Sequence, residues 1–180
     1  MAMDLNAKAA YIRGMMKGME FDPTTQEGKI IVAMMDLLEE MADVVSEHDD
    51  ALDQAVAEFL EKQPQVAYVN YPGLESDKYH ERAMKYMPKG GCGVVSFELK
   101  GGRKAAETFM KHLKLAAIET HVADARTCCL NPATSTHRQM SDEQLAAAGV
   151  PAGLVRISCG LEDKEDLIAD LAQALAQIED

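Results

Sequence analysis

The first 63 residues carry apolar side chains at the spacing of amphipathic helices. Between residues 5 and 19 the apolar positions recur every three or four residues, which predicts one helix. The stretch DPTTQEGK predicts a stop and a restart, with Asp22 or Thr24 as the N-cap and Glu27 closing a possible capping box. A second helix is therefore expected to follow, through residues 30–55.

Apolar positions of this second helix alternate four and three residues apart, which is the spacing of a heptad seam. The seam positions are Ile30, Met34, Leu37, Met41, Val44, His48, Ala51 and Ala55. The opposite face is acidic and is interpreted as a solvated surface. Methionines at seam positions are more often core residues than a partner site, although a methionine stripe is adaptable enough to bind another helix.

After Pro64 the periodicity changes, and short β-type runs alternate with amphipathic helical runs. Strands are predicted at residues 66–71, 92–99, 126–130 and 154–159, and helices at residues 76–86, 103–112, 141–148 and 163–178. Ser141 with Gln144 predicts a capping box, and Asp163 predicts an N-cap. The predicted fold class is α+β: a helical hairpin or long helix, then a small sheet of about four strands covered by helices. The predicted parts are a helical module over residues 1–54 and a domain over residues 55–180.

Composition narrows the class of protein. The chain has 180 residues, 47% of them hydrophobic, and no apolar run approaches the roughly 20 residues that span a bilayer. The first residues lack the apolar core of a secretory signal, so we expect a globular, cytoplasmic protein without a membrane partner. A net charge of −12, 5% aromatic residues and no Trp argue against nucleic acid as a partner.

The four cysteines predict no metal site. They form no C-x-x-C pair and have no histidine at zinc-ligand spacing, so they are interpreted as reduced, mostly buried thiols. Cys128 and Cys129 are adjacent on a predicted strand and would point to opposite faces, which makes it hard for both to bind one ion.

Three segments carry candidate chemistry. The loop PKGGCG (88–93) has the glycines of a phosphate-binding loop, but it leads from a helix into a strand, so Lys89 is interpreted as an ordinary loop lysine. The loop from Asn131 to Glu143 gathers hydroxyls, an amide and an imidazole, which are also ordinary turn residues.

The third segment is the apolar strand LVRISC, in which Arg156 needs an anion. A protein carboxylate could supply it, or a ligand carboxylate or phosphate gripped by two parallel hydrogen bonds. We expect Arg156 at the edge of the sheet, partly exposed, with at most one protein carboxylate near it.

Three stretches of the sequence, in this order along the chain, resemble a known protein family. They are VAYVNYPGLESDKYHERAMKYMPKGGCGVVSFELKGG, HVADARTCCLNPATSTHRQMSDEQLAAAGV and LVRISCGLEDKEDLIADLAQAL. From about Ala55 to its end the chain resembles the C-terminal domain of O-acetylhomoserine sulfhydrylases, which belong to the pyridoxal-phosphate-dependent Cys/Met metabolism enzymes of methionine biosynthesis. The implied fold is the small domain of a fold-type I pyridoxal-phosphate enzyme.

The resemblance implies a substrate site. Arg156 would grip the α-carboxylate of the amino-acid substrate, His121 would lie near the same carboxylate, and the loop carrying Asn131 and Thr136 would border the active-site mouth. One departure is visible: the family usually has HPA where this chain has Asn131-Pro132-Ala133, and Asn carries no charge. No catalytic, cofactor-binding or metal-binding residue is assigned.

The family's large domain should supply the Schiff-base lysine, the ring over the cofactor, its acidic partner and the phosphate loop, and none of those motifs is in this sequence. We therefore expect a transferase-family domain that is truncated or fused, is not catalytic alone, and binds no pyridoxal phosphate alone. Residues 1–54 look like the helical opening of a small bacterial family of unknown function. The alternative function is a helix-mediated interaction or assembly protein that uses residues 30–55, with a homo-oligomer or another helix as partner; a separate large-domain subunit is a third possibility.

Overall fold

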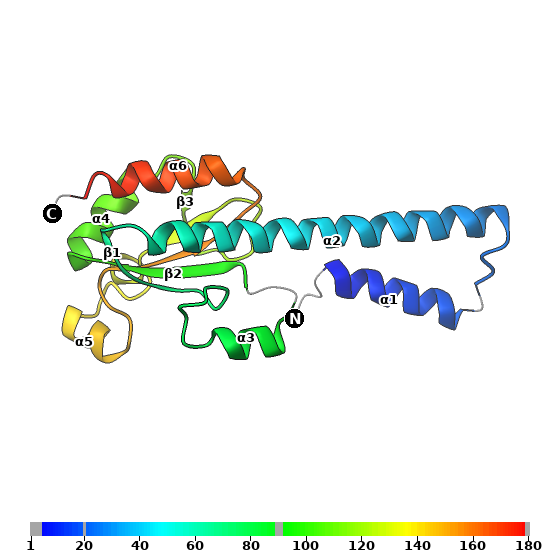
Figure 1. The fold of residues 1–180 in the computed structure, drawn as a ribbon, viewed down its shortest axis with the longest axis horizontal. Coiled ribbons are helices and arrows are strands. Elements are labelled where there is room, and N and C mark those ends of the chain that lie inside the picture. Colours follow the sequence, from blue (N-terminus) through cyan, green and yellow to red (C-terminus); the bar gives the residue numbers. More distant parts are fainter. Residues whose placement is uncertain (1–4, 20, 89–91, 179–180) are drawn as a thin grey trace. The chain divides into compact units, whose positions relative to one another are not determined.

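The computed structural model describes residues 5–19, 21–88 and 92–178, with the side chains of residues 5–6 and 43–50 left out (Figure 1). Within these residues, six α-helices, one 3₁₀ turn and five strands follow one another. In order they are α1 (Leu5–Gly18), α2 (Gln26–Glu61), β1 (Val66–Asn70), α3 (His80–Tyr86), β2 (Val94–Leu99), α4 (Gly102–His112), β3 (Ala117–Ile118), β4 (Cys128–Leu130), η1 (Pro132–Thr134), α5 (Asp142–Ala147), β5 (Leu154–Ser158) and α6 (Lys164–Leu175). None of the helices in these ranges is long and apolar enough to cross a membrane.

The chain divides into two compact units, residues 1–48 and 49–180. This division comes a few residues before the expected boundary at 54/55, and that boundary stays a prediction.

The first unit is a helical hairpin in which α1 runs beside the first half of α2 in the opposite direction (Figure 1). Its contact surface is narrow, with Ala9, Met35 and Ala42 buried. On one side of this contact the Arg13 guanidinium pairs with Asp36 and Glu39, each at 2.7 Å. Two helices alone bury little apolar surface, so packing within the hairpin by itself gives it little stability.

The start of α2 differs in detail from the prediction. Thr25, rather than Asp22 or Thr24, caps the helix, because its Oγ1 accepts from the Gly28 backbone N–H at 2.9 Å. Asp22 instead accepts from the backbone N–H of Thr24 at 2.8 Å and closes the preceding turn.

The predicted heptad seam is wrong in the second half of α2. Ala51 is exposed, whereas Leu52 and Val56 are buried against the sheet. In the first half the seam residues Ile30, Met34, Leu37 and Met41 are exposed as well, and the residues buried against α1 are Met35 and Ala42. Val44 and His48 lie outside the side chains that the structure describes.

The second unit is built on one five-stranded sheet in the order β1-β2-β5-β4-β3. All pairs are antiparallel except β3 with β4. The four predicted strands are all present. The additional strand, β3, has only two residues, too few to show an alternating pattern.

One face of the sheet is covered by helices α4 and α6 and by the last turns of α2 (Figure 1). Alternate residues of β2 and β5, such as Val95, Phe97, Val155 and Ile157, point into this core. The Phe97 ring meets the Phe109 ring of α4 edge to face, with centroids 5.7 Å apart. The α+β class and the layer of helices on a small sheet are therefore confirmed.

Helix α6 is fixed at both its start and its middle. Asp163 caps it by accepting from the backbone N–H groups of Glu165 and Asp166, as predicted. A side-chain hydrogen bond with Glu165, together with these backbone hydrogen bonds, holds the pKa of the Asp163 carboxyl below its usual value. Inside the helix, the buried Asp170 carboxylate accepts from three successive backbone N–H groups, those of Lys114, Leu115 and Ala116, at 2.8–3.0 Å. This carboxylate ties α6 to the segment that joins α4 to β3.

Candidate functional site

Arg156 lies in the middle of the sheet, not at its edge. It is the third of five residues of β5, the central strand, and is paired with Ser96 on β2 and with Leu130 on β4. The edge prediction is wrong because strand order depends on which strands pair, and a single strand's sequence does not specify its neighbours. Arg156 is half-buried, as predicted.

Arg156 belongs to a polar row that crosses three strands. Since cross-strand partners share a face, Asn70, Ser96 and Arg156 all project from the face opposite the helices. The Asn70 amide nitrogen is 3.4 Å from the Ser96 hydroxyl oxygen. Asn70 and Ser96 were not predicted as site residues. Alternation within each strand places them on the polar face, but only the register brings them beside Arg156.

Backbone carbonyls hold one end of the guanidinium. Arg156 Nη2 donates to the carbonyl oxygens of Thr120 and His121, at 2.9 and 3.1 Å. The Nε atom is buried and has no hydrogen-bond partner. Among the described residues no carboxylate lies within ion-pair distance of the guanidinium. The cation therefore has donor capacity left for an anion from outside the protein.

His121 contributes its backbone rather than its side chain to this arrangement. Its imidazole is exposed, and Nδ1 lies 3.0 Å from a Glu119 carboxylate oxygen and 3.7 Å from one of Asp124. The carbonyl group of His121 is the part that contacts Arg156.

Asn131 holds the loop after β4 in place. It is 1% exposed, and its Nδ2 donates to the carbonyl oxygens of Ala152 and Leu154, at 3.0 and 2.7 Å. Its Oδ1 accepts from the backbone N–H of Thr134 and so caps the turn η1. The Asn131 side chain therefore binds the backbone of its own loop and the backbone at the start of β5. Leu154, one of its partners, lies two residues before Arg156.

Thr136 lies on the exposed part of the same loop. Its hydroxyl oxygen is 2.9 Å from Nδ1 of His137. None of the described hydrogen bonds links Thr136 to Arg156. The structure thus brings His121 and Arg156 together through the backbone and leaves Thr136 apart from them.

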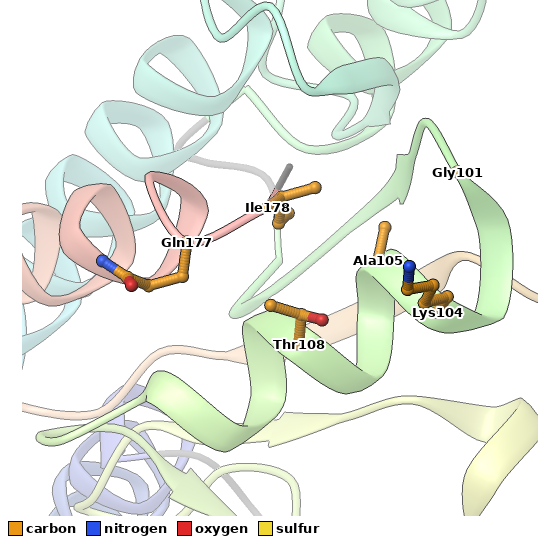
Figure 2. Close-up of a pocket in the computed structure, with 6 residues that line it drawn as sticks. All are labelled: Gly101, Lys104, Ala105, Thr108, Gln177 and Ile178. Carbon is orange, nitrogen blue, oxygen red and sulfur yellow. The ribbon is translucent and has the colours of Figure 1, made fainter. Parts of the chain in front are cut away.

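A hollow of about 260 Å³ lies away from the polar row. It is lined by Gly101, Lys104, Ala105, Thr108, Gln177 and Ile178 (Figure 2). Figure 2 shows Lys104, Ala105 and Thr108 on α4 facing Gln177 and Ile178, which follow α6. Since α4 and α6 cover the other face of the sheet, this hollow does not include Arg156 or any other predicted site residue.

The thiols do not offer a reactive group inside the sheet. Burial raises the pKa of Cys128, Cys129 and Cys159, and the Asp53 carboxylate raises that of Cys159 further, so all three stay protonated at neutral pH. Within the described ranges, no group of three or more His, Cys, Asp or Glu side chains is placed to hold a metal ion. Every described lysine is exposed, and Lys89 lies outside the described residues.

Comparison with known proteins places residues 44–176 in a family. The sequence profile of that family, "Cys/Met metabolism PLP-dependent enzyme", matches this range. O-acetyl-L-homoserine sulfhydrylase 1 of Thermus thermophilus is 49% identical over 121 residues, which cover 67% of this chain and 29% of that protein. L-methionine gamma-lyase of Fusobacterium nucleatum subsp. polymorphum is 46% identical over 123 residues, covering 68% of this chain and 31% of that protein.

The fold leads to the same family. A crystal structure of a Campylobacter jejuni protein described as an O-acetylhomoserine (thiol)-lyase, carrying N'-pyridoxyl-lysine-5'-monophosphate, matches with a TM-score of 0.69 and 35% identity over 79% of this chain and 34% of that chain. The chain spans about 30% of the length of the curated relatives it matches. The match over residues 44–176 and the likeness to these proteins show that the chain belongs to the Cys/Met metabolism PLP-dependent enzyme family.

Proposed function

We propose that residues 55–180 act as the C-terminal, substrate-binding domain of an O-acetylhomoserine sulfhydrylase-type enzyme, with Arg156 binding the α-carboxylate of the amino-acid substrate. The names of the most similar relatives support the reaction class. The observation that carries the site is the Arg156 guanidinium, which is held by two carbonyl oxygens and has no carboxylate partner among the described side chains.

The geometry suits a carboxylate ligand. The hydrogen bonds from Nη2 to two carbonyl oxygens restrict the orientation of the guanidinium plane. Less side-chain entropy is therefore lost when a ligand binds. The two N–H groups of Nη1 remain to donate to a ligand carboxylate, a charge-assisted pairing. Ser96 and Asn70 extend the polar row and offer donors to a second ligand group. In this proposal Asn131 and the carbonyl group of His121 position Arg156, while Thr136 borders the site.

The described residues do not fit pyridoxal phosphate. The cofactor, when bound, supplies an electron sink for chemistry at the amino acid, and it needs an enclosed lysine to carry it. All the described lysines are exposed, and the hollow beside Lys104 has no aromatic ring or carboxylate in its lining. We therefore propose that residues 1–180 alone are not catalytic and that the large domain of the family would have to complete the site.

Cofactor addition tests the second part of this proposal. With pyridoxal phosphate in slight excess, borohydride reduction followed by peptide mass spectrometry should show only low, scattered labelling of exposed lysines, without sulfhydrylase turnover. Stoichiometric labelling of one lysine together with turnover would refute it.

Ligand titration tests the site itself. We expect O-acetyl-L-homoserine at millimolar concentration to shift backbone NMR signals of residues near Arg156, such as Ser96 and Thr120, and its carboxamide analogue to shift them much less. Arg156→Gln should abolish the shifts, whereas Arg138→Gln, which removes an exposed guanidinium from the neighbouring loop, should keep them. Equal shifts with O-acetyl-L-homoserine and its carboxamide, or unchanged shifts in Arg156→Gln, would remove Arg156 from the site.

A fold control accompanies these variants. Arg156→Leu should change the free energy of unfolding by less than about 1 kcal/mol, because no ion pair is broken. A loss of about 3 kcal/mol or more would instead mark Arg156 as structural.

A second candidate function is helix-mediated assembly through the N-terminal helices. Exposed apolar side chains on α1 and on the first half of α2 favour it, including Met34, which is 58% exposed. This candidate is compatible with the first, because it uses a different unit of the chain.

A further inference from the structure

One side of the helical hairpin is apolar and exposed. Ten large apolar side chains of the hairpin are each at least 37% exposed: Tyr11, Ile12, Met15, Met19, Ile30, Ile31, Met34, Leu37, Leu38 and Met41. We call this set the apolar face. At roughly half exposure these side chains present on the order of 800 Å², more than the roughly 300–600 Å² of the largest patch on a typical monomer and close to what each partner contributes to a standard interface.

The ten side chains lie together because of helix geometry. At 3.6 residues per turn, the six on α2 fall within one arc of about 120°, and the four on or just after α1 fall within one of about 100°. On each helix the buried contact residues, Ala9 on α1 and Met35 and Ala42 on α2, separate the apolar arc from the ion pair of Arg13. In an antiparallel hairpin this order puts both arcs on the same side. Most charged residues of the two helices lie outside these arcs, whereas Lys8 on α1 and Glu27 on α2 fall within them.

Charge distinguishes the two helices. Helix α1 has three basic residues, Lys8, Arg13 and Lys17, and no acidic residue. Residues 26–42 of α2 carry four acidic residues and one basic residue: Glu27, Asp36, Glu39, Glu40 and Lys29. Within one hairpin this contrast already forms the ion pairs of Arg13. The same contrast in charge favours a partner that packs a basic helix against α2 and an acidic helix against α1.

We propose that the apolar face is the interface between two copies of this chain, which pair as a four-helix bundle with α1 of each copy against α2 of the other. A two-fold axis parallel to the helices gives this arrangement. Every helix then has antiparallel neighbours of opposite charge, and the two identical apolar faces cover each other. A second copy matches the area of the apolar face and the charge contrast between the two helices together. This pairing does not depend on the proposed substrate site.

Sedimentation velocity and light scattering of the full chain test the interface. We expect a mass of about twice the 19.7 kDa chain at 50 µM, falling toward the monomer on dilution. The double variant Met34→Glu/Leu38→Glu should raise the dimer Kd at least a hundredfold. The matched control Lys29→Glu makes the same change of two charges at an exposed site outside the apolar face and should leave Kd within about threefold of the original.

Two further measurements keep the outcome decisive. Circular dichroism at 222 nm should show that the double variant keeps its helices, and a single Leu37→Gln variant, which adds no charge, should still raise Kd at least tenfold. Lys8→Glu should weaken pairing more than Lys62→Glu, an equal charge change in the other unit. A monomeric chain at 50 µM, or a double variant that still dimerises, would overturn the interface. Equal effects of Lys8→Glu and Lys62→Glu on Kd would overturn the placement of α1 of one copy against α2 of the other.

Discussion

Asn131 holds the loop that follows β4 against the start of β5, and this contact sets the surroundings of Arg156 from one side. Both amide hydrogens of Asn131 are donated to backbone carbonyl groups and its oxygen caps η1, all within a buried environment. On the other side, the carbonyl groups of Thr120 and His121 hold the guanidinium. Single residues therefore position the cation without neutralising it.

At this scale we predict that Asn131→Ala lowers the free energy of unfolding by about 2–3 kcal/mol, because it leaves buried carbonyl groups and one N–H without partners. Urea denaturation followed by circular dichroism measures it. Thr136→Ala, on the exposed part of the same loop, should cost less than about 0.5 kcal/mol. Equal small effects of the two substitutions would show that the loop does not depend on Asn131.

At the scale of elements, α6 is attached through a buried carboxylate as well as through its apolar face. Asp170 accepts three backbone hydrogen bonds from the segment between α4 and β3, while Leu167, Leu171 and Ala174 face the sheet. A carboxylate that accepts several N–H groups is a strong local constraint, and it orders the start of the short strand β3.

Removing this carboxylate should therefore be costly. We expect Asp170→Ala to lower the free energy of unfolding by about 3 kcal/mol or more, since three donors lose their partner in a buried site. Chemical denaturation gives the value, with Glu165→Ala, an exposed acidic residue of the same helix, as the control at less than about 0.5 kcal/mol. A loss of less than about 1 kcal/mol for Asp170→Ala would show that water replaces the carboxylate.

The cap of α6 predicts a pH dependence. The pKa of Asp163 is lowered in the folded protein, chiefly by a side-chain hydrogen bond with Glu165 and next by the backbone N–H groups of Asp166 and Glu165, so the ionised form is favoured by folding. Its contribution is therefore complete above the unfolded value of about 3.9 and is lost as pH falls through the lower folded value.

The variant Asp163→Asn keeps a capping side chain but removes the titration. The original protein should be the more stable of the two at pH 6, and the difference should shrink as pH falls below about 4. Thermal unfolding across this pH range measures it. A stability difference between the two proteins that is the same at every pH would exclude the titration of Asp163 as a source of pH dependence.

At the scale of the whole molecule, the chain combines two units that differ in how much apolar surface each buries. The unit of residues 49–180 has a continuous buried core of sheet and helices. The hairpin buries few side chains and exposes a wide apolar face, so its stability should depend on what covers that face.

We therefore predict that thermal unfolding depends on protein concentration. The transition of the hairpin should move up on the order of 10 °C over a hundredfold increase in concentration, because dimerisation stabilises only the folded form. The transition of the sheet unit should stay constant. Differential scanning calorimetry at several concentrations separates the two, and concentration-independent scans would contradict a dimer built on the hairpin.

The sequence by itself determined the class of this fold and most of its elements. Helical spacing in the first third, four short β-type runs, the Ser141 capping box and the Asp163 cap are all local signals, and local signals survive in any tertiary context. Resemblance in ordered motifs also indicated the family, because it depends on residue identity rather than on contacts.

Only the tertiary structure decided where Arg156 lies and what surrounds it. The order of strands placed β5 in the centre, and the register set Ser96 and Asn70 beside the guanidinium. The strand pairs around Arg156 join residues 26 or more apart in the sequence, and no local pattern encodes such pairs. For the same reason, the heptad pattern did not show that α2 buries Leu52 and Val56, since the sheet selects the buried face of a helix through its 3.6-residue turn.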